Sequence, residues 1–219
     1  MCGIAGIIHR GKSSNIGSEM TAMLAALKHR GPDSSGFAVY GKPRSGDYLM
    51  RIKVAEQEDM DKGHGILGLI EERKGEVNKL LLEHGAKIKE QENATAYALR
   101  YVISHEGDIE DMARHIEEID GVEILSLGHG LELIKDLGDA TVVSEQYGLG
   151  TFEGTHAIGH TRMATESDVD IRSAHPYWAY PFNDVSVVHN GQLTNYWSYR
   201  RILERQGRRF MSDCDSELI

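Results

Sequence analysis

The chain has 219 residues, enough for one large domain or two small ones. Apolar residues make up 40% and charged residues 26%, the usual balance for a globular protein in water. The net charge of −10 arises from 34 acidic and 24 basic residues, and it argues against sequence-independent binding to nucleic acids, which requires a basic surface.

Cysteine usage and hydropathy indicate a cytoplasmic protein. The two cysteines, Cys2 and Cys214, are too few for a disulfide framework and suit a reducing compartment. No apolar run approaches the roughly 18 residues of a membrane span. The N-terminus also lacks the basic and apolar regions of a signal peptide. We therefore expect a cytoplasmic location.

The N-terminal part of the chain predicts a strand, a helix and a strand hairpin. Residues 3–9 are apolar and predict a buried strand. Apolar side chains three and four residues apart predict an amphipathic helix that stops near Gly31–Pro32. Residues 36–40 and 47–54 predict the two strands of a hairpin, because the glycines and the proline between them favour a turn. The apolar positions of the helix are Met20, Met23, Leu24 and Leu27.

The next segment is more highly charged. Residues from about 56 to 92 predict a helix. Alternating apolar residues from 97 to 103 then predict a half-buried strand. The apolar face of the helix is expected to contain Val77, Leu80 and Leu81.

A second helix and a second hairpin follow. Asp108 predicts the N-cap of this helix. Residues 122–127 and 131–135 predict strands on either side of the turn Gly128–Gly130. Because strand, helix, strand and strand can form a compact unit, we expect residues 56–150 to be an inserted αβ subdomain. The apolar positions of the second helix are Ile109, Met112, Ala113, Ile116 and Ile119.

The last part of the chain returns to glycine-rich strands and polar turns. Residues 155–162 and 185–189 predict strands, and residues 194–206 predict a helix that a following glycine ends. Asp213 or Asp215 has the features of a helix N-cap close to the last residue, so we expect the chain to be truncated at its C-terminus. The inward side chains of the helix are expected to be Tyr199, Ile202 and Leu203.

A cysteine stands directly after the initiator methionine. Removal of Met1 would leave Cys2 with both a thiol and a free α-amine. A thiolate attacks carbonyl carbons, and a neutral amine beside it can accept its proton. Cys2 is therefore a candidate N-terminal nucleophile that needs no histidine partner. The alternative is a small apolar residue at the start of a buried strand.

Four short motifs follow one another along the chain. They are Cys2–Gly6 (CGIAG), His29–Gly36 (HRGPDSSG), Gly159–Thr165 (GHTRMAT), and His189–Gly191 (HNG) followed by Asp215–Glu217 (DSE). In this order they resemble the motifs of the class II glutamine amidotransferases. Those enzymes are N-terminal-nucleophile hydrolases that take ammonia from the side-chain amide of glutamine.

The resemblance implies the groups that act on the amide. Cys2 would be the nucleophile, and its α-amine would serve first as base and then as acid. The side-chain amide of Asn190 and the backbone N–H of Gly191 would form the oxyanion hole. Read alone, this Asn-Gly pair is more typical of a hairpin turn.

The resemblance also implies the residues that bind free glutamine. A guanidinium pairs with a carboxylate through two parallel hydrogen bonds, and Arg162 matches the family position that holds the α-carboxylate. Asp215 matches the acid that receives the α-ammonium, although it also fits a helix cap. Thr165 lies in the third motif and is assigned to substrate binding. Arg30 and Gly31 match the loop beside the N-terminal cysteine and are assigned a supporting role.

The fold implied by the resemblance is α+β, the four-layer αββα sandwich of N-terminal-nucleophile hydrolases. Residues 1–55 and 151–219 would form a discontinuous type-2 amidotransferase domain, truncated at the C-terminus. Residues 56–150 carry none of the motifs, so we expect this inserted subdomain to contact a partner synthase. A stabilising decoration is the alternative.

The sequence gives no support for a metal or a nucleotide. Eleven histidines invite a search for ligands, but neither His-Glu-x-x-His nor Cys-x-x-Cys occurs, and we expect no metal. A glycine-rich nucleotide loop is also absent, so binding of ATP or NAD is not supported. The histidines considered as ligands are His156, His160, His175 and His189.

Two features favour one branch of the family. Residues 163–167 with 174–181, and the inserted segment that ends at 154–160, resemble stand-alone amidotransferase subunits of archaeal-type glutamate synthases and related methylglutamate synthases. There the glutaminase, synthase and oxidoreductase parts are separate chains. The resemblance implies a synthase subunit as partner and no cofactor in this chain, with flavin and iron–sulfur clusters in partner subunits. The alternatives are a domain serving phosphoribosylamine, amino-sugar, asparagine or methylglutamate synthesis, and an inactive regulatory relative.

Overall fold

The computed structural model of the protein describes residues 2–55, 59, 65–164 and 169–219. In this part of the chain, most strands belong to one of two antiparallel sheets of four strands. The strands are β1 Gly3–Ile8, β2 Ser34–Tyr40, β3 Tyr48–Lys53, β4 Lys87–Asn93, β5 Ala98–Ser104, β6 Glu123–Gly128, β7 Leu131–Leu137, β8 His156–Arg162, β9 Tyr177–Trp178 and β10 Ser186–Val187. The helices are α1 Ile16–Ala26, α3 Ile66–Glu83, α4 Ile109–Ile116, α5 Ala140–Gln146 and α6 Tyr196–Arg205.

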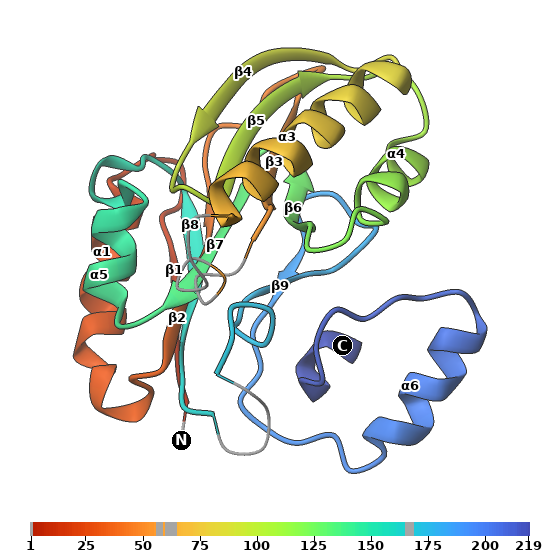
Figure 1. The fold of residues 1–219 in the computed structure, drawn as a ribbon. Coiled ribbons are helices and arrows are strands. Elements are labelled where there is room, and N and C mark those ends of the chain that lie inside the picture. The colour runs from red at the N-terminus through yellow and green to blue at the C-terminus, as the bar shows by residue number, and fades with distance from the viewer. Residues whose placement is uncertain (1, 56–58, 60–64, 165–168) are drawn as a thin grey trace.

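Each sheet is covered by its own pair of helices (Figure 1). The first sheet has the strand order β1–β8–β2–β7, and α1 and α5 pack against it. The second has the order β4–β5–β3–β6, and α3 and α4 cover it. β9 and β10 pair with each other in a small separate ribbon. This mixture of helices and antiparallel sheets makes the chain an α+β protein.

The first sheet and its helices confirm the predicted strand and helix at the N-terminus. Met20 and Leu24 of α1 are fully buried, while Met23 is exposed. The predicted buried strand is β1, but its side chains alternate, and Ile4 and Ile8 are exposed. The reason is that β1 lies at the edge of the sheet, where α1 covers only one of its faces.

Both predicted hairpins are wrong. β2 pairs with β7 and β8, whereas β3 pairs with β5 and β6, so the chain passes from one sheet to the other between β2 and β3. The chain also changes sheets between β6 and β7. The two crossings are hydrogen-bonded to each other, with Gly41 N donating to Gly130 O at 2.9 Å and Arg44 N to His129 O at 3.0 Å. The Asp184 carboxylate accepts three further backbone N–H groups at the second crossing.

The segment 56–150 contributes to both sheets. Val77 and Leu81 of α3 are buried as predicted, but α3 ends at Glu83 and residues 87–93 form β4 rather than more helix. Strands β4 to β6 belong to the second sheet, while β7 hydrogen-bonds to β2 in the first. These pairings tie the segment to strands outside it. The boundaries of the inserted subdomain stay a prediction. None of the helices in the described ranges is long and apolar enough to cross a membrane.

Buried ion pairs join the two sheets. Arg51 of β3 contacts Glu132 of β7 at 2.6 Å. Glu123 of β6 receives Lys53 at 3.0 Å and Lys135 of β7 at 3.2 Å. Burial alone would raise the pKa of Glu123, but the two lysines hold it down at about 2. The carboxylate is therefore ionised at neutral pH, and the contact between the sheets is in part charged.

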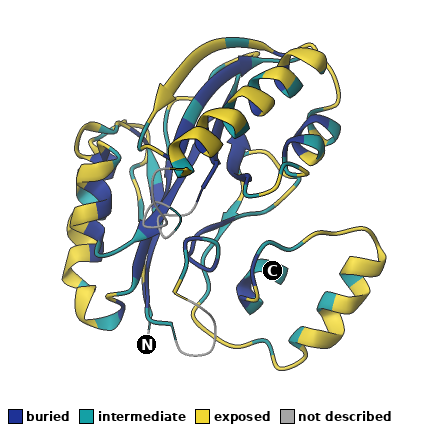
Figure 2. Ribbon diagram, viewed as in Figure 1, coloured by how far each residue is buried: buried dark blue, intermediate teal, exposed yellow. Residues whose placement is uncertain are grey.

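The C-terminal part is less deeply buried than the sheets (Figure 2). The predicted helix is α6, but the inward positions are wrong for Tyr199 and Ile202, which are exposed, and no residue of α6 is buried. A 3₁₀ turn, Asp215–Leu218, follows. Its N-cap residue is Cys214, and no side chain caps it, so the predicted aspartate cap is wrong.

Candidate active site

The N-terminus lies beside the end of β8. Gly3 is paired with Thr161, so Cys2 stands next to the residues that follow this strand. The half-buried Cys2 Sγ lies 3.7 Å from Met163 O, a contact in which the thiol donates to the backbone carbonyl. Strand pairing therefore places the predicted nucleophile at the end of the first sheet.

The predicted oxyanion residues reach the same place from a distant part of the chain. Asn190 Nδ2 donates a hydrogen bond to Cys2 O at 3.1 Å. A side-chain amide has two N–H groups, so this contact uses one of them. A Cβ atom at Gly191 would lie only 2.4 Å from Nε2 of His189, so a larger residue there would have to displace the His189 ring.

Arg162 is the last residue of β8 and is only 4% exposed. It lies opposite Ser34 of β2. Its backbone carbonyl accepts a hydrogen bond from Asp33 N at 3.1 Å, and Asp33 Oδ2 accepts one from Ala164 N at 2.7 Å. Asp33 therefore fixes the chain on both sides of Met163. The sequence analysis missed this role, although Asp33 lies in the second motif.

The loop with Arg30 and Gly31 packs against β8. Arg30 ends a 3₁₀ turn that begins at Lys28. Gly31 is buried, and a Cβ atom there would lie 2.5 Å from the carbonyl carbon of Thr161 and 2.6 Å from that of Arg162. Because both neighbours are main-chain atoms, only glycine lets the two segments approach this closely.

Replacement of Gly31 with alanine is expected to lower both stability and glutamine hydrolysis. The methyl group must displace the end of β8, and overpacking of this kind costs about 1–3 kcal/mol. A thermal melt and kcat/KM for glutamine measure the two effects. Gly75→Ala on α3 is the matched control, because nothing lies within 4 Å of a Cβ atom at that position. Equal melting temperatures and rates for the two variants would contradict the close approach.

Asp215 contacts the segment that follows Gly191. Its Oδ2 accepts a hydrogen bond from Leu193 N at 2.6 Å, and its Oδ1 accepts one from Ser216 Oγ at 3.2 Å. The carboxylate thus joins the C-terminal 3₁₀ turn to the loop that carries Asn190. Thr165, the remaining predicted substrate-binding residue, lies outside the described residues.

Buried histidines support the same loop. His160 Nε2 lies 3.2 Å from the carbonyl oxygen of His189 and therefore donates to it. His189 Nδ1 is 2.8 Å from Ser216 Oγ, and the rings of His160 and His175 stack at 4.3 Å. Burial lowers the pKa of His160 to about 4, so this ring is neutral at pH 7. Three of the histidines considered as metal ligands thus lie together behind Asn190, whereas His156 stacks on a tyrosine of β2.

The structure also contains a cavity of about 550 Å³. It is bounded by α4, β9 and the C-terminal segment, with Lys135, Tyr177 and Glu217 in its lining. None of the predicted site residues in the described part of the chain lines it. The predicted catalytic residues Cys2 and Asn190 meet at the end of β8 rather than in this cavity.

Similarity to known proteins agrees with this chemistry. No protein-family profile matches the chain. The sequence is 40% identical over 222 residues to a protein of Methanothermobacter thermautotrophicus that carries the name of a glutamine amidotransferase, covering 100% of this chain and 70% of that protein. It is 30% identical over 220 residues to the glutamine amidotransferase-like protein GlxB of Rhizobium meliloti, covering 100% of this chain and 67% of that protein.

A shorter match extends to another kind of glutamine-dependent protein. The sequence is 33% identical over 90 residues to the glutamine–fructose-6-phosphate aminotransferase of Thermus thermophilus, which covers 41% of this chain and 15% of that protein. The two longer matches run along the entire chain, and both relatives are named for glutamine amidotransfer. The chain therefore belongs to the class II glutamine amidotransferase family.

Proposed function

We propose that the protein hydrolyses the side-chain amide of glutamine through a thioester on Cys2 and supplies the ammonia to a partner synthase. The observation that carries the proposal is the meeting of Cys2, the end of β8 and Asn190. The Asn190 side chain contacts the Cys2 backbone although the two residues are 188 positions apart in the sequence. Family membership supports glutamine as the substrate.

The reaction uses groups that lie at this place. The α-amine takes the proton of the Cys2 thiol, and the thiolate attacks the side-chain carbonyl carbon of glutamine. The oxyanion accepts hydrogen bonds from the Asn190 amide and the Gly191 N–H. Collapse breaks the C–N bond, and the α-amine returns the proton to the leaving ammonia. Water then hydrolyses the thioester to release glutamate and the free thiol.

Charged residues would hold the two ends of the amino acid. Arg162 would bind the α-carboxylate, and its burial beside Cys2 supports this role because a guanidinium pairs most strongly where water is excluded. Asp215 would receive the α-ammonium. Its carboxylate has about four acceptor positions, so the contacts to Leu193 and Ser216 leave capacity for a ligand. We assign substrate contact to Thr165 and support of the Cys2 loop to Arg30 and Gly31.

The fold proposed for this chemistry is the αββα sandwich of N-terminal-nucleophile hydrolases. The order of layers would be α1 with α5, the first sheet, the second sheet, and α3 with α4. Two observations support it: each helix pair packs on its own sheet, and buried ion pairs join β3 and β6 to β7. Homology to the aminotransferase of Thermus thermophilus agrees with this assignment.

The favoured acceptor is 2-oxoglutarate, with a glutamate synthase subunit as the partner. We expect flavin and iron–sulfur clusters in the partner subunits and no cofactor in this chain. Ammonia released into water at neutral pH becomes mostly ammonium, which is a poor nucleophile. A synthase therefore gains from receiving ammonia through an enclosed path.

A reconstitution experiment tests this assignment. The chain is mixed with synthase and electron-donor subunits, glutamine and 2-oxoglutarate. Glutamate should form by reductive transfer, and glutamine turnover should rise severalfold when 2-oxoglutarate is present. The control is the Cys2→Ala variant, whose complex should form glutamate from an added ammonium salt but not from glutamine. If glutamine turnover changes with neither the partner nor 2-oxoglutarate, the glutamate synthase assignment fails. The ammonia would then serve phosphoribosylamine, amino-sugar, asparagine or methylglutamate synthesis. If the chain shows no glutaminase activity at all, it would instead be an inactive regulatory relative.

A further inference from the structure

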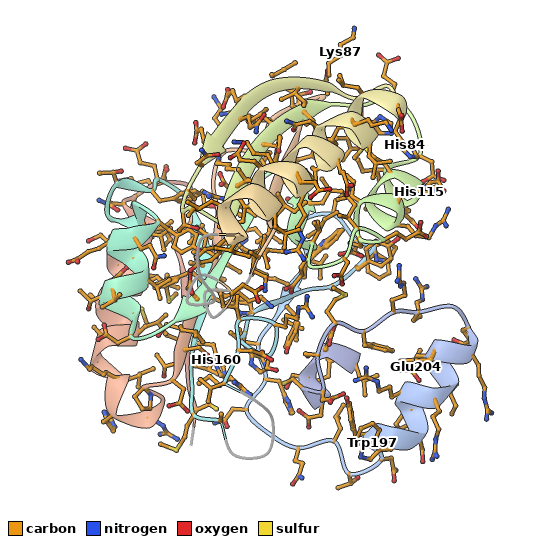
Figure 3. The ribbon with its side chains drawn as sticks, viewed as in Figure 1. His84, Lys87, His115, His160, Trp197 and Glu204 are labelled. Carbon is orange, nitrogen blue, oxygen red and sulfur yellow. The ribbon has the colours of Figure 1, made fainter. Side chains whose placement is uncertain are left out.

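Three side chains with metal-binding groups meet where α3 ends beside α4. His84 is the C-cap residue of α3, and Asp111 and His115 lie on α4. Figure 3 shows the two histidines next to each other. One ligand atom from each of the three residues lies within 4.8 Å of the other two. This convergence lies outside the Cys2 region and has no part in the proposed glutamine chemistry.

The local sequence explains why the three side chains face one another. Asp111 and His115 are four residues apart, so they lie on the same face of a helix. The helix α3 ends at Glu83, and Gly85 adopts a left-handed backbone with φ of 77°, which turns the chain away directly after His84. The rings of His84 and His115 therefore come to 4.9 Å between centroids.

The geometry is close to that of a coordination shell. Asp111 Oδ2 lies 3.8 Å from His84 Nδ1, and the ring of His115 lies beside both residues. Ligand atoms in a tetrahedral zinc site with bonds of about 2.0–2.1 Å are about 3.4 Å apart. The three side chains are 21%, 40% and 35% exposed, so small rotations can close the shell and water can complete it.

The hydrogen bonds of His115 also suit a ligand. Its Nδ1 lies 2.8 Å from the backbone carbonyl of Asp111 and therefore donates to it. This bond fixes the tautomer in which Nε2 carries the free lone pair. Metal-bound histidines generally donate their other ring N–H in this way.

We infer that His84, Asp111 and His115 form a binding site for a divalent transition-metal ion, with Zn²⁺ as the best match. Two imidazole nitrogens and one carboxylate oxygen are donors that Zn²⁺ favours, and Mg²⁺ or Ca²⁺ would require more oxygen ligands. The ion would tie the end of α3 to α4. Both helices bury side chains in the core of the second sheet, so an ion bound only to the folded chain would stabilise this half of the molecule.

Arg114 is the natural competitor of the ion. It forms an ion pair with the Asp111 carboxylate and so partly neutralises the charge that a metal ion would meet. Removing the guanidinium should therefore strengthen metal binding. If Asp111 serves only to pair with Arg114, its removal should bring no such gain in affinity.

The experiment is a titration of tag-free Cys2→Ala protein with Zn²⁺, followed by calorimetry and by thermal melts. The Cys2→Ala background removes a thiol that could bind the ion near the N-terminus. We expect one ion per chain and a higher melting temperature. His84→Ala and His115→Ala should each weaken binding at least tenfold, and Arg114→Ala should tighten it severalfold. Co²⁺ should give the absorption bands of a site with nitrogen and oxygen ligands.

His9→Ala is the matched control, because His9 pairs with the Glu19 carboxylate at 2.7 Å beside the first sheet. This variant should bind Zn²⁺ as the parent protein does. Circular dichroism shows whether each variant is folded, and Asp111→Asn offers a second variant of nearly the same shape. Unchanged affinity in His84→Ala, or equal losses in His84→Ala and His9→Ala, would overturn the site.

Discussion

Replacement of Cys2 with alanine is expected to abolish glutamine hydrolysis and to leave the protein folded. Loss of the attacking group removes the thioester route, and for nucleophiles of this kind the rate falls by at least about a thousandfold. The fold should tolerate the change, because Cys2 is half-buried and its thiol makes only a long contact to Met163 O at 3.7 Å. Glutamate release and a thermal melt provide the two measurements.

Activity should also depend on removal of Met1. With Met1 attached, the nitrogen of Cys2 is an amide and cannot accept the thiol proton, so the base of the proposed mechanism is missing. Mass spectrometry of the active enzyme should show a chain that begins at Cys2. The decisive comparison is between protein released from a fusion at Cys2 and protein that retains Met1. Full activity of the form with Met1 would contradict the α-amine mechanism.

Elements with a strong local signal could be predicted from the sequence. The buried positions of α1 follow the apolar spacing that includes Met20 and Leu24. Asp108 caps α4 as predicted, accepting hydrogen bonds from Glu110 N and Asp111 N. These features depend on residues within a few positions of each other, which is the range that periodicity and capping rules describe.

Strand partners could not be predicted in the same way. The turn residues between β2 and β3 are typical of a hairpin, yet the chain uses them to change sheets. The choice depends on β7 and β8, which reach β2 from far along the chain. The charged segment of β4 reads as helix because Lys and Glu favour helices, but pairing with β5 makes it a strand.

In the candidate site, too, some residues could be predicted from the sequence and others could not. Motif residues such as Cys2 and Asn190 could be named from the sequence, and the structure brings them into contact. Asp33 and His160, which support the neighbouring backbone, gave no comparable signal. Their roles depend on carbonyl and N–H groups of segments that only folding brings close.

Replacement of Arg162 with lysine is expected to lower kcat/KM for glutamine by about tenfold to a hundredfold. Lysine keeps the charge but loses the two parallel hydrogen bonds to a carboxylate, which corresponds to roughly 1.5–3 kcal/mol of transition-state binding. Arg162 is only 4% exposed, so water cannot readily replace the missing contacts. A change of less than about twofold would show that Arg162 does not bind the α-carboxylate.

A second substrate separates binding from a general effect on the fold. Glutamine with its α-carboxylate converted to an amide should react slowly with the parent enzyme, because it cannot pair with Arg162. For the same reason, Arg162→Lys should lower the rate with this substrate only a little further. Arg51→Lys provides the matched buried arginine, because Arg51 is 8% exposed on β3 and pairs with Glu132. It should lower the melting temperature but leave the ratio of rates for the two substrates unchanged. If Arg51→Lys changes that ratio as much as Arg162→Lys does, the effect arises from the stability of the sheets rather than from a carboxylate contact.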